Sequence, residues 1–234
     1  MFMNLKALIS AALISFLLVA LIACEALDEL DPRIPGPDPI PWRVISKDSI
    51  TSGTFMGMAI GDSADDVYKA IRRLPSNMRV DHLQLVNNQS SDLYALEDRI
   101  PLYSYLVLDE HRGSDKGVQI SLENGRVSAI FLNSGKSLAR WPQGESKKSS
   151  VILGDKAESL YDKLVNIRRN SRYRSSFERI SLMTKDLDSS FDPAMAQLPQ
   201  WYFSNLENGG EMRQVQMFLT EGRLAYVLHS RMAR

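Results

Sequence analysis

The only thiol in the 234-residue chain belongs to Cys24, so this residue is the first candidate for covalent chemistry. It follows Lys6 and then residues 7–23, a run without a charge that ends in a small alanine. A short basic segment, an apolar segment and a small final residue are typical of a secretory signal rather than of a folded element. Chemistry at this cysteine is therefore expected to be an attachment made where the signal is cut.

The sequence Leu-Ile-Ala-Cys at positions 21–24 resembles the lipobox of bacterial lipoproteins. The resemblance implies that a peptidase removes residues 1–23, that the Cys24 sulfur receives a diacylglycerol, and that the new amine is also acylated, for example with palmitate. Several buried acyl chains, at about 0.8 kcal/mol per CH2, anchor a folded domain where one chain would not. Two alternatives stay open: an ordinary signal with a chance cysteine, and a retained membrane anchor, since residues 7–23 are just long enough to span a bilayer.

Acyl chains on Cys24 would make the membrane the first partner of the protein. Glu25 follows the cysteine, whereas enteric-type sorting retains lipoproteins with aspartate there at the inner membrane. The resemblance therefore implies an outer-membrane lipid anchor facing the periplasm, with an inner-membrane anchor as the alternative. Once this thiol is acylated, no cysteine remains for a disulfide or a thiolate metal site, so the core alone must hold the folded part together.

The other residues that could do chemistry form no recognisable catalytic pattern. The three histidines, His82, His111 and His229, lack the spacing of metal ligands. No serine lies in a G-x-S-x-G sequence, and the glycine-containing loops at 113–117 and 207–210 lack a phosphate-binding spacing. We predict no metal, no cofactor and no enzymatic activity, with a Ser-His-Asp site assembled in space as the open alternative.

Charge excludes one further class of partner. Residues 1–23 contain one lysine and no acid, so the remainder of this neutral chain carries a net charge of −1. A nucleic-acid-binding protein would present a strongly basic field, and we expect no such partner. The basic cluster RRNSRYR (168–174) is interpreted as the solvated end of a helix, and the alternative is a local docking patch for an acidic group.

The segment after Cys24 is rich in proline and acids. Prolines at 32, 35, 37, 39 and 41 exclude a helix interior or a central strand and favour an extended, semi-rigid spacer. We therefore predict a signal peptide at 1–23, an acidic Pro-rich tether at 24–50, and a folded body made of two units at 51–145 and 146–234.

The two units are predicted from an internal repeat. Three pairs of segments match in the same order and at nearly constant offset: 61–71 with 154–164, 101–106 with 199–204, and 118–132 with 215–229. Two similar amphipathic segments could match by chance, but three ordered blocks favour a duplicated unit of about 95 residues.

Each unit is expected to be one helix followed by four strands. Apolar residues recur with helical spacing from position 64 to 74 and from 157 to 167, and Asp62 and Asp155 are the expected N-caps. Two-residue turns are expected at 123–126 (ENGR) and 220–223 (TEGR). The expected strands are 80–86, 102–108, 118–123, 126–132, 177–183, 201–205, 215–220 and 223–229.

The expected fold class is α+β, with two tandem repeats that each pack a helical segment on a four-stranded antiparallel sheet. This order of elements, and the sequence MGMAIGDSADDVYKAI (56–71), resemble the SmpA/OmlA-type small lipoproteins and the tandem β-lactamase inhibitor protein. The first resemblance implies help in outer-membrane barrel assembly, and the second implies inhibition of a hydrolase. No binding residue can be transferred from either family position by position.

Aromatic residues at matched strand positions are the candidate partner-binding residues. They are Tyr103, Tyr105, Trp201, Phe203 and Phe218. Phe218 falls on the strand face opposite Val215 and Met217, where it would meet solvent, a partner, or the sheet of the other unit. We expect a non-catalytic protein-binding or assembly module of the envelope whose partner is another envelope protein. Inhibition or regulation of an envelope or secreted hydrolase is the alternative.

Overall fold

The computed structural model describes residues 41–207 and 210–234. The predicted signal peptide, Cys24 and most of the predicted tether lie outside these residues. The α-helices of the described part are α2 (Ala64–Arg72) and α3 (Leu160–Arg169). Its strands are β1 (Arg43–Ile50), β2 (Thr54–Phe55), β3 (Met58–Ala59), β4 (His82–Leu85), β5 (Gln89–Ser90), β6 (Tyr103–Asp109), β7 (Val118–Glu123), β8 (Arg126–Leu132), β9 (Arg140–Trp141), β10 (Val151–Ile152), β11 (Arg179–Asp186), β12 (Gln200–Leu206), β13 (Met212–Thr220) and β14 (Arg223–Ala233).

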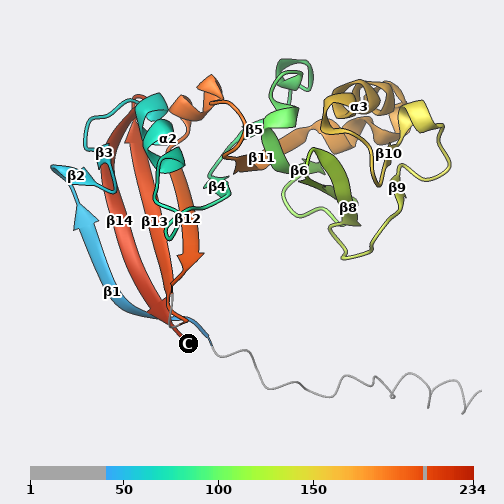
Figure 1. Cartoon of the computed structure of the whole chain (residues 1–234). Coiled ribbons are helices and arrows are strands. Elements are labelled where there is room, and N and C mark those ends of the chain that lie inside the picture. The colour runs from blue at the N-terminus through green and yellow to red at the C-terminus, as the bar shows by residue number, and fades with distance from the viewer. Residues whose placement is uncertain (1–40, 208–209) are drawn as a thin grey trace, which may run out of the picture. The chain divides into compact units, whose positions relative to one another are not determined.

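Ten of these strands form one antiparallel sheet (Figure 1). Its order is β1-β14-β13-β12-β4-β11-β6-β7-β8, and the short β5 pairs with β11 beside this path. All eight strands expected from the sequence are present, and the α+β class is confirmed in its coarse form. The residues from Trp42 to Arg234 make one compact unit around a single hydrophobic core.

The strands do not form the two separate four-stranded sheets that the sequence predicted. Strand β11 lies between β4 and β6, and β4 in turn lies between β11 and β12. Strand β4, which follows α2 in the chain, therefore pairs with β12 from the later half of the chain. Strand β11, which follows α3, pairs with β6 from the earlier half. The alternation of apolar and polar residues specifies which face of a strand is buried, but not which strand lies beside it. The sequence pattern therefore could not predict these pairings.

Hydrogen bonds attach each helix to the hairpin of the other half of the chain. Before α2, the Gly61 amide donates to the Leu224 carbonyl at the end of the β13–β14 hairpin, at 2.8 Å. Before α3, the Gly154 amide donates to the Val127 carbonyl beside the β7–β8 turn, also at 2.8 Å. The first helix is thus held on the last hairpin, and the second helix on the earlier one.

The aspartates before the helices have another role than the one predicted. The N-cap of α2 is Ser63, whose hydroxyl accepts from the Asp66 amide at 3.2 Å. Asp62 instead accepts from the Ala59 amide, and Asp155 accepts from the Ile152 amide, both at 2.7 Å. Both carboxylates close the turn that precedes a helix, so the N-cap prediction was wrong for Asp62 and Asp155.

The two hairpin turns were predicted correctly. Asn124 and Gly125 have φ values of 51° and 68°, and Glu221 and Gly222 have φ values of 50° and 73°. Positive φ at both central residues matches the twist of the flanking strands and favours Asn-Gly. Glu221 adopts the same geometry without the short side chain that stabilises it.

The folded part begins earlier than the predicted boundary at residue 51. Residues Arg43–Ile50, assigned to the tether, form the edge strand β1 and pair with β14, with a bulge between Val44 and Ser46. The prolines end at Pro41, and the following eight residues lack the composition that had defined the tether. Only the β-branched residues Val44 and Ile45 could have signalled this boundary.

Candidate protein-binding face

Pairing in register divides the large sheet into two faces. On the inner face, Trp201 pairs with Leu85 and Met217, and all three side chains are buried beneath the helices. The halves of the sheet meet edge to edge instead of stacking, so the opposite face is not covered by another sheet of the described residues. We call this opposite surface the open face.

One row of paired residues crosses the open face from β1 to β8. It contains one residue from each strand along the path, and we call it the central row: Ser49, Leu228, Gln216, Tyr202, Gln84, Thr184, Tyr105, Ser121 and Ala129. None of the nine carries a charge, although about a quarter of the chain is charged. Eight of them are partly buried, and Ser49 is exposed.

Side-chain hydrogen bonds connect polar members of this face across the strands. The Thr184 hydroxyl donates to the Gln84 amide oxygen at 3.1 Å, and the Tyr105 hydroxyl donates to the Gln119 amide oxygen. Within β13, the Gln216 side-chain amide donates to the Gln214 amide oxygen at 2.7 Å. These bonds restrict the rotamers of the amides, so the face is ordered before any partner arrives.

The predicted partner-binding residues fall into two groups. Tyr103, Trp201 and Phe203 are core residues, exposed by only 2%, 0% and 1%. A partner cannot reach them, and their aromatic character is explained by packing. Tyr105 and Phe218 lie on the open face and are partly exposed, and the Phe218 ring stacks on Tyr226 at 4.3 Å between centroids.

Sequence reasoning missed most of the open face. Tyr202, Tyr226, Gln84 and Gln216 were not singled out, because isolated Tyr and Gln residues in strands carry no motif. The signal was present only as alternation: Tyr202, Gln84 and Gln216 each lie between two buried apolar residues of their strand, and Tyr226 precedes the buried Val227. Register between strands that are far apart in the chain was needed to align them.

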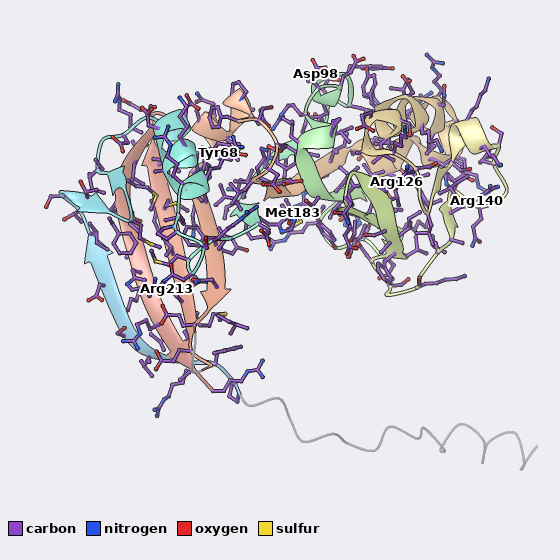
Figure 2. All side chains as sticks on the ribbon, viewed as in Figure 1. Tyr68, Asp98, Arg126, Arg140, Met183 and Arg213 are labelled. Carbon is purple, nitrogen blue, oxygen red and sulfur yellow. The ribbon has the colours of Figure 1, made fainter. Side chains whose placement is uncertain are left out.

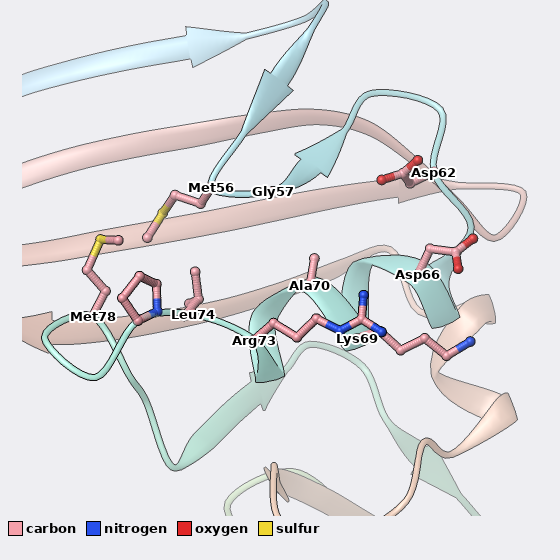
Figure 3. Close-up of a pocket in the computed structure, with 10 residues that line it drawn as sticks. Met56, Gly57, Asp62, Asp66, Lys69, Ala70, Arg73, Leu74 and Met78 are labelled. Atoms are coloured by element: carbon pink, nitrogen blue, oxygen red, sulfur yellow. The ribbon is translucent and has the colours of Figure 1, made fainter.

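A groove of about 820 Å³ runs beside α2 on the other side of the sheet (Figure 3). Met56 and Met78 point toward one another at one end, and Asp62 and Asp66 lie at the other. The charges that line it are balanced, because Lys69 and Arg73 line it together with the two aspartates. The groove therefore has no net charge with which to select a charged ligand.

Three buried polar atoms lie on the inner face near the methionine end of the groove. They are the side-chain atoms Asn205 Oδ1, Arg213 Nε and His229 Nε2, and none has a hydrogen-bond partner among the described residues. Arg213, labelled in Figure 2, donates through Nη1 to the Met78 sulfur at 3.2 Å. Burial lowers the pKa of His229, with the Arg213 charge as the next cause, so this imidazole is neutral at pH 7.

The closest approach to catalytic chemistry is between Lys185 and Ser189. The Lys185 ammonium donates to the Ser189 hydroxyl, and burial lowers the pKa of Lys185 to about 8. A serine beside a lysine of lowered pKa can act as a nucleophile and base. Here, however, Lys185 has no exposed surface, and the partly buried Ser189 hydroxyl donates to the Asp186 carbonyl at 2.7 Å, so both groups already have partners in the fold.

Two other kinds of site, for a metal ion and for a membrane, concern residues 41–207 and 210–234. There, no group of three His, Cys, Asp or Glu side chains comes together as a metal site would require. No helix of the described residues has the length and apolar character to cross a bilayer.

The candidate site is therefore the open face. Of the five residues predicted to bind a partner, Tyr105 and Phe218 lie on it. No protein-family model, no curated protein and no solved structure matches this chain.

Proposed function

We propose that the chain is a lipid-anchored protein of the bacterial envelope that binds another envelope protein and catalyses no reaction. The anchor is a set of acyl chains on Cys24, and the site of action is the periplasmic side of the outer membrane. The observation that carries the binding function is the uncharged central row, which contains one residue from each strand along the path β1-β14-β13-β12-β4-β11-β6-β7-β8. Cores of protein interfaces are depleted in charge and enriched in aromatic residues in the same way.

The chemistry of the face indicates the kind of partner. Tyr105, Tyr202 and Tyr226 combine large apolar area with a hydroxyl and lose little conformational entropy on binding. The glutamines between them offer both donors and acceptors. A partner surface without charges, which presents backbone or side-chain amides and apolar groups, would complement them, whereas a charged surface would lose its hydration without gaining an ion pair.

We also propose that the body consists of two repeats that have exchanged their helical segments. The pairs of contacts that hold the helices support this, because Gly61 corresponds to Gly154, and Asp62 to Asp155, at the same offset of 93 residues. Exchange joins two small sheets into one and so doubles the width of the open face.

Site-specific photocrosslinking tests the binding face. A benzophenone amino acid replaces Tyr202, in the middle of the central row, in cells that make the full chain. The matched control is the same amino acid at the exposed Asp98, labelled in Figure 2, which lies in a loop outside the central row. A discrete adduct of one envelope protein from position 202, and none from position 98, is expected.

The outcomes separate the alternatives. Equal adducts from both positions, or none from position 202, would overturn the open face as the binding surface. An adduct with a soluble hydrolase whose activity falls on binding would replace the assembly function with inhibition.

The anchor is tested separately by mass spectrometry. The parent chain should lose residues 1–23 and gain a diacylglycerol and one amide-linked acyl chain at Cys24. A Cys24→Ser chain should carry no lipid and leave the membrane fraction. A parent chain of unmodified mass would contradict lipidation without affecting the crosslinking test.

A further inference from the structure

A second cavity, of about 480 Å³, lies at the end of the sheet that carries β6, β7 and β8. Three segments build it: the β6–β7 loop, the connection from β8 through β9, and the 3-10 helix Ser171–Phe177 that follows α3. This volume falls within the range of about 300–1,000 Å³ that is usual for small-molecule sites. It belongs neither to the open face nor to the groove beside α2.

The floor of the cavity is apolar and aromatic. Trp141 is nearly buried and meets the Tyr173 ring edge-on at 6.0 Å between centroids. Leu132, Leu138 and Pro142 complete this surface. A flat or extended apolar body of ligand size could bury itself there, as in most ligand pockets.

The rim is positively charged. Lys116, Lys136 and Arg172 line it, against a single carboxylate from Glu110. Within the described ranges, none of these three cations has a carboxylate at ion-pair distance. In the groove beside α2, by contrast, Lys69 is paired with Asp65 at 2.6 Å. Cations without carboxylate partners around an apolar floor, in a chain of zero net charge, complement an anion that has an apolar body, and one of them, Arg172, lies over the Tyr173 ring at 5.9 Å.

The walls are held in place without a ligand. The buried Asp109 accepts from the Gly113 amide at 2.9 Å and from the Ser114 hydroxyl. Asn133 joins the β6–β7 loop to the end of β8, because its side chain donates to the Ser114 carbonyl at 2.8 Å. A cavity with fixed walls loses little conformational entropy when it is filled.

We propose that this cavity binds a small organic anion, a carboxylate or sulfonate joined to an aryl or acyl body. The apolar body lies on Trp141 and Tyr173, and the acid group meets Lys116, Lys136 and Arg172. The hydroxyls of Ser175 and Ser176, which also line the cavity, can donate to the same acid group. This site is independent of the proposed protein-binding function, since it uses none of the central row.

Titration calorimetry on the purified full chain tests the proposal. The probes are 2-naphthoate and octanoate, and the controls are their neutral amides, 2-naphthamide and octanamide, which have the same apolar bodies. Each anion is expected to bind at least tenfold more tightly than its amide, with affinity that falls as salt rises. The anion with the higher affinity shows whether the cavity prefers an aryl or an acyl body.

Two variants locate the site. Lys116→Gln combined with Lys136→Gln changes only exposed side chains and should weaken anion binding at least tenfold while leaving amide binding and the melting temperature unchanged. Lys69→Gln, in the groove beside α2, is the matched control and should leave both anion binding and amide binding unchanged. Equal affinity for anion and amide, equal loss in the two variants, or no binding at millimolar concentration would overturn the proposal.

Discussion

The ammonium nitrogen of Lys185 lies 5.3 Å from the centre of the Tyr68 ring, and the Lys185 side chain is fully buried. Tyr103 presents its ring to the same nitrogen at 5.9 Å, and the Asp186 carbonyl accepts from it at 2.8 Å. Lys185 comes from β11, Tyr68 from α2 and Tyr103 from β6. This buried cation therefore links α2 and β6, which precede α3 in the chain, with β11, which follows it.

The lowered pKa of Lys185 predicts that the free energy of unfolding changes with pH in the alkaline range. Burial, assisted by Arg72 and opposed by Asp186 and Asp192, lowers the pKa of Lys185 from 10.5 to about 8. Between these values the unfolded chain binds more protons, so the free energy of unfolding should rise with pH, by up to about 3 kcal/mol. Urea unfolding between pH 7.5 and 10 measures this rise.

Tyr68 limits the rise at higher pH. Burial raises the pKa of Tyr68 to about 12, so its contribution is present below pH 10 and is lost between pH 10 and 12. Stability should thus pass through a maximum near pH 10. Lys185→Met should remove the rise below this maximum. A parent chain with a flat profile, or a variant with the same rise as the parent, would contradict the assignment.

Asp192 is expected to be the most sensitive polar residue of the core. It accepts from the Tyr103 hydroxyl at 2.5 Å and from Arg99 Nε at 2.8 Å, and it is 2% exposed. Asp192→Ala leaves Arg99 without its buried partner and should cost about 3–5 kcal/mol of unfolding free energy. Asp188→Ala is the control, because its ion pair with Arg79 is exposed and contributes about 0–1 kcal/mol. Similar losses in the two variants, measured by urea unfolding, would be evidence against a buried network.

Glu221 is expected to be a site of stabilising substitution. Its φ of 50° is strained for a residue with a long side chain, and the equivalent position in the β7–β8 turn holds Asn124 at 51°. Glu221→Asn should raise the free energy of unfolding by about 0.5–1 kcal/mol, and Asn124→Glu should lower it by a similar amount. Thermal unfolding of both variants checks the pair, and changes of the same sign would contradict the turn geometry.

The proposed exchange of helical segments predicts which strands loosen when a helix is damaged. Leu164 of α3 and Ile71 of α2 are both buried, and replacing either with alanine should cost about 2–5 kcal/mol. Hydrogen exchange should show that Leu164→Ala loosens β6–β8 first, although α3 follows these strands in the chain. Ile71→Ala should loosen β12–β14 first. If each variant loosened the strands that follow its own helix instead, the exchange would be refuted.

Local features of this fold were accessible from the sequence. The strand at Val118–Glu123 alternates buried side chains with more exposed ones, and the helix at Ala64–Arg72 keeps its apolar stripe. Both patterns are short-range, since they depend on the backbone periods of 2.0 and 3.6 residues. The turn at Asn124 and Gly125 was predictable for the same reason, because positive φ is a property of the residues themselves.

The candidate site was predictable only in part. Phe218 was assigned correctly to the face opposite Val215, from alternation alone. Trp201 and Phe203 were not recognised as core residues, because an aromatic residue in a strand suits a core and an interface equally well. Which of the two it joins depends on what covers that face.

By itself, then, the sequence determined the strands, the helices and the hairpin turns, while the repeat and the lipidation of Cys24 stay predictions. Only the tertiary structure decided that β11 and β4 lie between the two halves, that α2 is held on the β13–β14 hairpin, and that nine uncharged residues align in one row. The physical reason is that local backbone preference acts over a few residues. Pairing between strands about 100 residues apart, such as Gln84 with Thr184, depends instead on how all the apolar faces are buried together.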